Sequence, residues 1–106
     1  MKRLSVAIDG NMQFPTWCRR PSGQVNSYLL AAGVARSITV PAAATKVLFS
    51  CTTNFYAINN GTASAPADVV NGSAAELNPA GWVVEPADVI SVIAPTEGVI
   101  TVSYYA

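Results

Sequence analysis

The chain has 106 residues, which is the size of one domain, and its composition is that of a folded protein with little surface charge. Hydrophobic residues make up 51% and charged residues only 11%, against about 25% charged residues in a typical soluble domain. This composition excludes an intrinsically disordered chain. The net charge of zero gives no support to broad electrostatic binding of nucleic acid or of an anionic membrane.

The charges are divided unevenly along the chain. All six cations lie in the first 46 residues together with a single acid, Asp9, and the other five acids all follow Lys46. Such asymmetry predicts charge-paired contacts, either within the fold or between chains. A sandwich that interleaves its two halves would mix the signs again in space.

Turn-forming residues divide the chain into short segments that are rich in β-branched and aromatic residues. About eight such segments, without helical periodicity, predict a single antiparallel all-β domain, a sandwich or a barrel. We expect residues 25–106 to form this domain and residues 1–24 to form an N-terminal arm, or a first strand plus a loop. The expected strands are Leu4–Ile8, Ser27–Ala32, Val34–Val40, Lys46–Cys51, Asn54–Asn59, Trp82–Glu85, Val89–Ala94 and Val99–Tyr105.

The N-terminal segment combines aromatic, methionine and arginine side chains, which are enriched at protein interfaces, with two prolines that stiffen the chain. One interpretation is an extended arm that binds a partner; the other is a strand plus loop whose Trp17 closes one end of the sandwich. A pair of adjacent arginines is not a basic patch, so nucleic-acid binding is not expected. The candidate partner-binding residues are Met12, Phe14, Trp17, Arg19 and Arg20.

The last two expected strands are apolar on both faces, and a strand of this kind needs cover on both faces. The core covers one face, and a second copy of the chain is the favoured cover for the other, since large exposed apolar patches are uncommon on monomers. The alternative is an ordinary surface that tolerates some apolar residues. The candidate self-association residues are Val89, Ile93, Val99, Tyr104 and Tyr105.

The sequence lacks the residues and motifs of common catalytic sites. It contains no histidine, which excludes Ser-His-Asp triads, Cys-His dyads and histidine-containing metal sites. No glycine motif for binding phosphate is present. We therefore expect no enzymatic activity, no cofactor and no metal. Cys18 and Cys51 are expected to be free thiols, with Cys51 buried by its strand parity.

Two near-identical pentapeptides, at residues 66–70 and 86–90, each place an aspartate two residues after a proline. A calcium loop would need several oxygen ligands, whereas each of these loops has one carboxylate. We therefore predict turns in which Asp68 and Asp88 accept hydrogen bonds from nearby backbone amides.

Neither export nor membrane insertion is expected from the sequence. The apolar segment Leu4–Ile8 is shorter than the core of a signal peptide, which needs about 7–15 residues. No apolar run approaches the roughly 18 residues of a membrane-spanning helix.

Across residues 34–106, a succession of short motifs resembles small virion structural proteins of tailed bacteriophages, which are encoded near the major capsid protein. The resemblance implies a β-sandwich or jelly-roll-like subunit that assembles into the particle, commonly as a capsid decoration (cement) protein. The motifs are Ser37–Ala42, Val47–Ser50, Asn54–Ala57, Ala65–Val69, Gly72–Ser73, Glu76–Pro79, Ile90–Ala94 and Val99–Ala106.

The expected function is therefore that of a non-enzymatic phage virion protein, assembled in the host cytoplasm, which stabilises the capsid by bridging major capsid protein subunits. The late strands would form a homo-oligomer, for which the resemblance favours a trimer, and the arm would contact the shell. The alternative is a tail, neck or fibre adaptor, or a glycan-binding module of the virion. In that case Tyr28, Trp82 or Tyr104 would stack on sugar rings.

Overall fold

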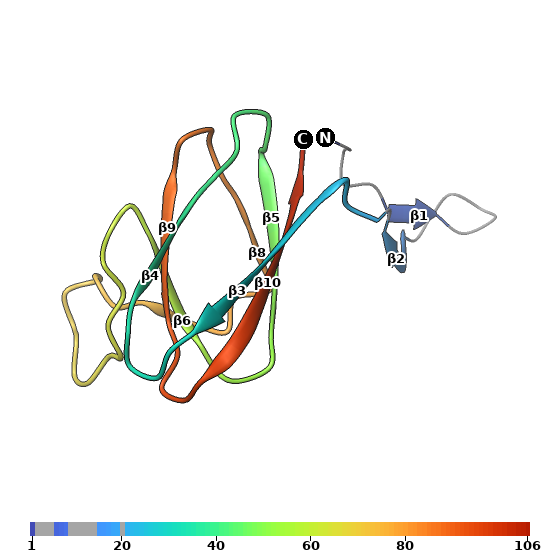
Figure 1. The fold of residues 1–106 in the computed structure, drawn as a ribbon. Coiled ribbons are helices and arrows are strands. Elements are labelled where there is room, and N and C mark those ends of the chain that lie inside the picture. Colours follow the sequence, from blue (N-terminus) through green and yellow to red (C-terminus); the bar gives the residue numbers. More distant parts are fainter. Residues whose placement is uncertain (2–5, 9–14, 20) are drawn as a thin grey trace.

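The computed structural model describes Met1, Val6–Ile8, Pro15–Arg19 and residues 21–106, and for the strand residues before position 20 it describes the backbone only. The described residues form strands and no helix, as Figure 1 shows. The strands are β1 (Val6–Ile8), β2 (Pro15–Arg19), β3 (Gln24–Leu30), β4 (Arg36–Thr39), β5 (Lys46–Cys51), β6 (Tyr56–Asn59), β7 (Glu76–Leu77), β8 (Gly81–Val83), β9 (Val89–Ile93) and β10 (Gly98–Tyr105).

Eight of these strands form two four-stranded antiparallel sheets that lie face to face (Figure 1). We call the sheet with the order β3-β10-β5-β8 the front sheet, and the sheet with the order β4-β9-β6-β7 the back sheet. Strands β1 and β2 form a separate antiparallel hairpin. The predicted all-β sandwich of about eight strands is confirmed.

The pairings are nested in a way that defines the topology. Strand β3 pairs with β10, β4 with β9, β5 with β8, and β6 with β7, all antiparallel. The chain therefore forms one long two-stranded ribbon, which rolls up so that β10 also pairs with β5 and β9 with β6. This arrangement is a jelly roll, built from two Greek keys.

The core fills the space between the two sheets, and the alternation of side chains along each strand explains its composition. In β5, for example, Val47 points inward and is fully buried, whereas Ser50 is exposed on the outer face. The fully buried core side chains include Leu30, Ile38, Val47, Ile90, Val92, Ile100, Val102 and Tyr104.

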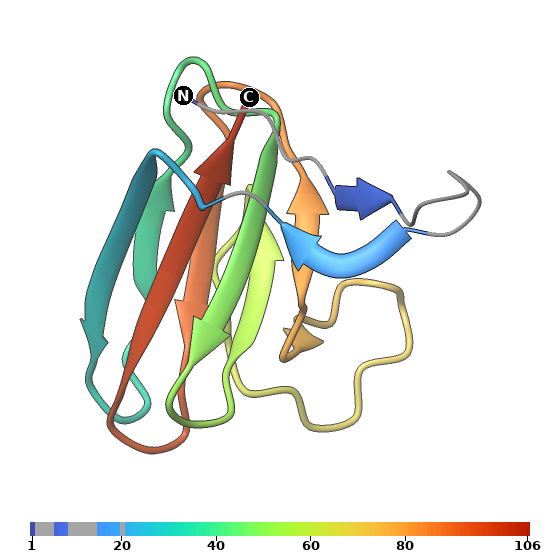
Figure 2. The ribbon, with the colours of Figure 1, turned by 90° about the vertical axis from the view of Figure 1, so that its right-hand side faces the viewer.

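Strands β9 and β10 each have a neighbour on both sides within their sheets, and the chain itself covers part of their outer faces. On β9, the Ser91 side chain is buried and its Oγ accepts a hydrogen bond from the Ala63 N–H at 2.9 Å, so the segment after β6 lies over the back sheet. On β10, Tyr105 is fully buried although it follows the inward-facing Tyr104. Figures 1 and 2 place the β1–β2 hairpin on this outer side of the front sheet.

Candidate interaction surface

The predicted arm forms, in its described part, the β1–β2 hairpin, with Val6 opposite Arg19 and Ile8 opposite Pro15. Of the five candidate arm residues, Trp17 and Arg19 lie in β2, where only the backbone is described. The other three, Met12, Phe14 and Arg20, lie outside the described residues.

The five candidate self-association residues do not form one exposed surface. Tyr104, Tyr105 and Ile93 are buried within the single chain and offer nothing to a second copy. Val89 is half-buried, and only Val99 is exposed, with 38% of its surface accessible. The chain itself covers the three buried residues, and the expectation that another subunit covers the late strands stays a prediction.

An exposed apolar surface lies instead along β3, an edge strand of the front sheet (Figure 2). Val25 and Leu29 are 51% and 60% exposed on its outer face, and Val99 lies directly opposite Leu29 in the register. We call Val25, Leu29 and Val99 the β3 patch. The alternation along β3 would by itself place apolar Val25 and Leu29 inward and polar Gln24 and Asn26 outward, and the burial of Leu30 in the structure shows that the opposite parity holds.

In the first half of β3, the side chains that face the inside of the sandwich are polar, namely Gln24 and Asn26. Asn26 Nδ2 donates to the Tyr28 hydroxyl at 3.2 Å, and these side chains are half-buried. The neighbouring Tyr104 hydroxyl is buried, and no described residue forms a hydrogen bond with it. Burial raises the pKa of Tyr104 above its usual range, and the nearby Tyr28 raises it further. The Tyr104 hydroxyl therefore stays neutral across the physiological range of pH.

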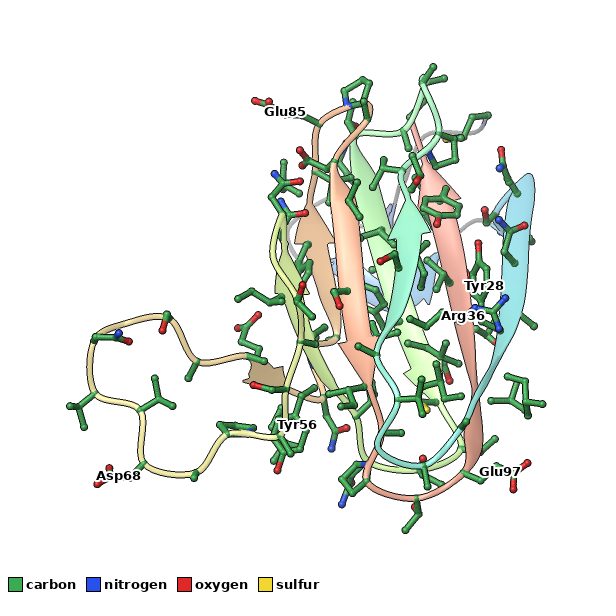
Figure 3. All side chains as sticks on the ribbon, turned by 60° about the vertical axis from the view of Figure 1, so that its left-hand side comes forward. Tyr28, Arg36, Tyr56, Asp68, Glu85 and Glu97 are labelled. Carbon is green, nitrogen blue, oxygen red and sulfur yellow. The ribbon has the colours of Figure 1, made fainter. Side chains whose placement is uncertain are left out.

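Arg36, on β4, reaches across the open side of the sandwich to β3 (Figure 3). Its guanidinium carbon lies 4.8 Å from the centre of the Tyr28 ring, and its Nη1 donates to the Leu29 carbonyl at 3.0 Å. This cation–π contact and hydrogen bond tie the two sheets together at their shared edge.

The three aromatic residues proposed to stack on sugars are placed unfavourably for that role. Tyr104 is fully buried, and Arg36 occupies one face of the Tyr28 ring. Trp82 packs edge-on against Phe49, with ring centres 5.2 Å apart, and its Nε1 donates to Glu76 at 2.7 Å.

A polar groove of about 600 Å³ lies at one end of the sandwich, between the β5–β6 connection and the residues that follow β7. Its walls are held together because Asn78 Oδ1 accepts the Phe55 N–H at 2.9 Å and Asn78 Nδ2 donates to Asn54 Oδ1 at 3.0 Å. The lining contains hydroxyls and amides but no charged side chain: Phe49, Ser50, Cys51, Thr52, Thr53, Asn54, Phe55, Asn78, Pro79, Ala80 and Thr96.

Cys51 lies in the lining of this groove as a free thiol, half-buried against the core. Its sulfur is 3.9 Å from the Thr53 hydroxyl. The side chain of Cys18 is not among those described.

Asp88 behaves as predicted for a turn. Its carboxylate accepts hydrogen bonds from the Glu85 backbone N–H at 3.0 Å, from Asn59 Nδ2 at 3.1 Å and from Asn60 Nδ2 at 3.2 Å. These bonds, the backbone bond first, hold the pKa of Asp88 below its ordinary value. The Asp68 side chain has no hydrogen bond among the described residues, so the near-identical pentapeptides do not form equivalent turns.

Comparisons with protein-family models, with curated proteins and with solved structures found no match for this chain. Function must therefore be argued from the surfaces described above.

Within the part of the chain that the structure describes, no group of three or more His, Cys, Asp or Glu side chains is placed to hold a metal ion. The same residues include no helix that could span a membrane. The candidate interaction features are therefore the β3 patch, the polar groove and the loop of residues 60–75, which projects from the sandwich.

Proposed function

We propose that this protein is a non-enzymatic structural component of a tailed-phage virion, which binds the outside of the capsid and stabilises it by bridging capsid subunits. The resemblance of residues 34–106 to small virion proteins supports the proposal. The jelly roll is compatible with it, but this architecture also serves lectins and cupins, so the fold alone does not choose a function.

The observation that carries the proposal is the amount of apolar side chain that this small, charge-poor domain exposes. Besides the β3 patch, Val70 is 91% exposed in the loop of residues 60–75. Figure 3 shows this loop projecting from the sandwich, with Asp68 at its far end. Exposed apolar residues on a projecting loop are typical of elements that contact another protein.

Repetition would strengthen such a contact. A capsid presents many identical sites, so several weak contacts made by one oligomer add up through avidity. Because buried apolar area supplies most of the free energy of such an association, little surface charge is needed.

A binding experiment with capsids tests the proposal. Purified protein is mixed with shells of the major capsid protein encoded by the same genome, and cosedimentation and electron microscopy measure the number and position of bound copies. We expect many copies spread over the shell. No binding would overturn the proposal, and a few copies at one vertex or on the tail would assign the protein to the neck or tail.

A truncated chain tests the role of the arm. Deleting residues 1–20 removes β1 and β2 but leaves every strand of both sheets. We expect a folded sandwich that no longer attaches to shells, with circular dichroism as the check on folding. The arm is not the attachment element if the truncated chain decorates shells at full occupancy.

The polar groove supports a second candidate, a glycan-binding module of the tail or fibre. Hydroxyl and amide groups without charge suit the hydroxyls of a neutral sugar. A glycan array, probed with the same purified protein, distinguishes this candidate from capsid decoration.

A further inference from the structure

We infer that the protein forms a two-fold dimer in which the β3 edges of two copies pair antiparallel, joining their front sheets into one continuous sheet. This inference is independent of capsid binding, because the dimer would form in the absence of any shell. It starts from the backbone of β3, whose outer edge has no strand beside it among the described residues.

The hydrogen bonds between β10 and the end of β5 show which backbone groups of β3 point away from β10. Thr52 N donates to the Val99 carbonyl at 3.1 Å, and Val99 N donates to Thr52 Oγ1 at 3.0 Å, so the backbone groups of Val99 point away from β3. Val99 lies opposite Leu29, which makes this a non-hydrogen-bonded pair. The N–H and C=O of Leu29 therefore point out from the edge, and by alternation so do those of Ser27 and Val25.

This row of free groups is complementary to itself. A two-fold axis beside Ser27, the central residue of β3, places Ser27 opposite its own copy and Val25 opposite Leu29 of the second copy. The three outward-pointing residues of one strand then face the three of the other, as hydrogen-bonded antiparallel pairs require. Side chains opposite each other lie on the same face, so apolar Val25 meets apolar Leu29 twice.

The β3 patch becomes continuous in this arrangement. In each copy Val99 already lies beside Leu29, so pairing would extend the row to Val25 of the second copy. The apolar side chains would then cover one another on the outer face of the joined sheet.

The other sheet edges are less suited to pairing. Strand β3 has seven residues, none of them charged, and neither Gly nor Pro interrupts it. Edge strands β4, β8 and β7 have four, three and two residues, and β4 begins with Arg36. Long uncharged edges are the ones that pair with another chain unless something blocks them.

Among the described residues, Arg36 is the one side chain with a hydrogen bond to an outward-pointing backbone group of β3, the Leu29 carbonyl. Arg36 lies on β4 of the back sheet, so its side chain approaches the Leu29 carbonyl from the inner face of the front sheet. Because a carbonyl oxygen has two acceptor lone pairs, Leu29 can accept from Arg36 and from a paired strand at the same time.

Residue-resolved amide hydrogen exchange by NMR, combined with analytical ultracentrifugation over a range of concentrations, tests the dimer. We expect the amides of Asn26 and Tyr28 to be protected at every concentration, because they bond to β10. The amides of Val25, Ser27 and Leu29 should gain protection only as the dimer forms. A monomer at the highest concentration, or an oligomer in which these three amides still exchange fast, would overturn the inference.

Ser27→Pro removes the central outward N–H and leaves the backbone hydrogen bonds to β10 in place, and proline is tolerated at such edge positions. We expect this variant to be a folded monomer. It also removes the exposed side-chain hydrogen bond between Ser27 Oγ and Thr101 Oγ1, which are 3.3 Å apart, so Ser27→Ala, which removes that bond alone, is made beside it and should remain dimeric. Val83→Pro is the matched control, at an exposed position on the opposite edge of the same sheet. Val84 N donates to the Thr45 carbonyl at 2.8 Å, so the N–H of Val83 points outward as that of Ser27 does. Val83→Pro should remain dimeric, and equal dissociation of both proline variants would contradict the inference.

A charge pair tests the register even if Ser27→Pro fails to fold. Val25→Lys and Leu29→Asp should each be monomeric, because a charge would face an apolar side chain. Mixed together, the two variants should form a heterodimer, since the two-fold register places Lys opposite Asp in one pair and leaves Leu29 opposite Val25 in the other. A mixture that stays monomeric would show that the register is wrong.

Discussion

Asp88 connects three loops at one end of the sandwich. Its carboxylate binds the loop before β9 and the two asparagines at the end of β6, and its carbonyl accepts the Val40 N–H at 2.9 Å. Asn60 Oδ1 in turn accepts the Val89 N–H at 2.9 Å. Both carboxylate oxygens are used, so the ionised form is the one that fits this turn.

The lowered pKa of Asp88 gives its contribution to stability a definite sign. The pKa in the folded chain lies below the ordinary 3.8, so the stabilisation is complete above that value and is lost as the pH falls through the folded pKa. We expect Asp88→Asn to lower the free energy of unfolding at neutral pH, and the difference from the parent chain to shrink below about pH 4. Urea unfolding at several pH values measures this difference.

Asp68→Asn is the matched control for this prediction, because it makes the same change in the near-identical pentapeptide. The Asp68 side chain has no hydrogen bond among the described residues, so its variant should unfold like the parent chain at every pH. A difference of equal size and pH dependence in both variants would contradict the role assigned to Asp88.

The Tyr104 hydroxyl lowers the free energy of unfolding, and a substitution that removes this one oxygen atom should raise it. Within the part of the chain that the structure describes, this buried hydroxyl has no hydrogen-bond partner, and an unsatisfied buried hydroxyl destabilises a fold by roughly 1–3 kcal/mol. We expect Tyr104→Phe to raise the free energy of unfolding by about 1 kcal/mol, measured by chemical denaturation. A loss of stability would show that the hydroxyl has a partner, such as a buried water.

At the scale of single residues, the sequence predicted the Asp88 turn but not the difference between Asp88 and Asp68. The bond from the Glu85 N–H is local, whereas Asn59 and Asn60 come from the end of β6, and the near-identical pentapeptide around Asp68 has no such partners among the described residues. The burial of both Tyr104 and Tyr105 depends on which segments lie over each face of β10, and no local pattern contains that information. The exposure of Val25 and Leu29 follows from the alternation of side chains along β3 only once the structure has shown that Leu30 points inward.

At the scale of the strand, the close approach of β5 and β8 depends on one glycine. A Cβ atom on Gly81 would lie 2.5 Å from Leu48 Cδ2 and 2.7 Å from the Val47 carbonyl oxygen, and a backbone atom cannot give way easily. Gly81 lies opposite Leu48 in the register, so any added side chain forces these two strands apart.

We therefore expect Gly81→Ala to lower the free energy of unfolding by about 1–3 kcal/mol, the usual cost of overpacking. Gly61→Ala is the control, because the three atoms nearest a Cβ there belong to the Ile58 side chain and the nearest lies at an ordinary 3.4 Å. Its effect should stay within about 0.5 kcal/mol. Thermal or urea unfolding measures both variants, and equal losses would exclude the steric explanation.

All eight strands expected from the sequence overlap strands of the structure, because β-branched runs between turn residues are a strong local signal. The two strands that were not expected are β2 and β7. Strand β2 begins at Pro15, and β7 has only two residues, Glu76 and Leu77. Both are defined by the strand they pair with rather than by their own residues, so sequence periodicity could not reveal them.

At the scale of the whole molecule, the order of the strands was not predictable in the same way. Which strand pairs with which depends on contacts between distant parts of the chain, and the rolled ribbon brings its two ends together. Ser22 Oγ, for example, donates to the Tyr104 carbonyl at 2.6 Å across 82 positions of sequence. The candidate site shares this dependence, since the β3 patch joins residues from the first and the last strand of the sandwich.

The position of β10 between β3 and β5 has a consequence for the synthesis of the protein. The strand that completes the front sheet, β10, leaves the ribosome after the other three strands of that sheet, and β9, which completes the back sheet, leaves it shortly before. Until β9 and β10 are made, the nascent chain can form only the β5–β8 and β6–β7 pairs of the two sheets, and β3 and β4 have no partner strand. The two complete sheets can therefore form only after β10 has been made, and until then the apolar segments of the earlier strands must be shielded from neighbouring chains on the polysome.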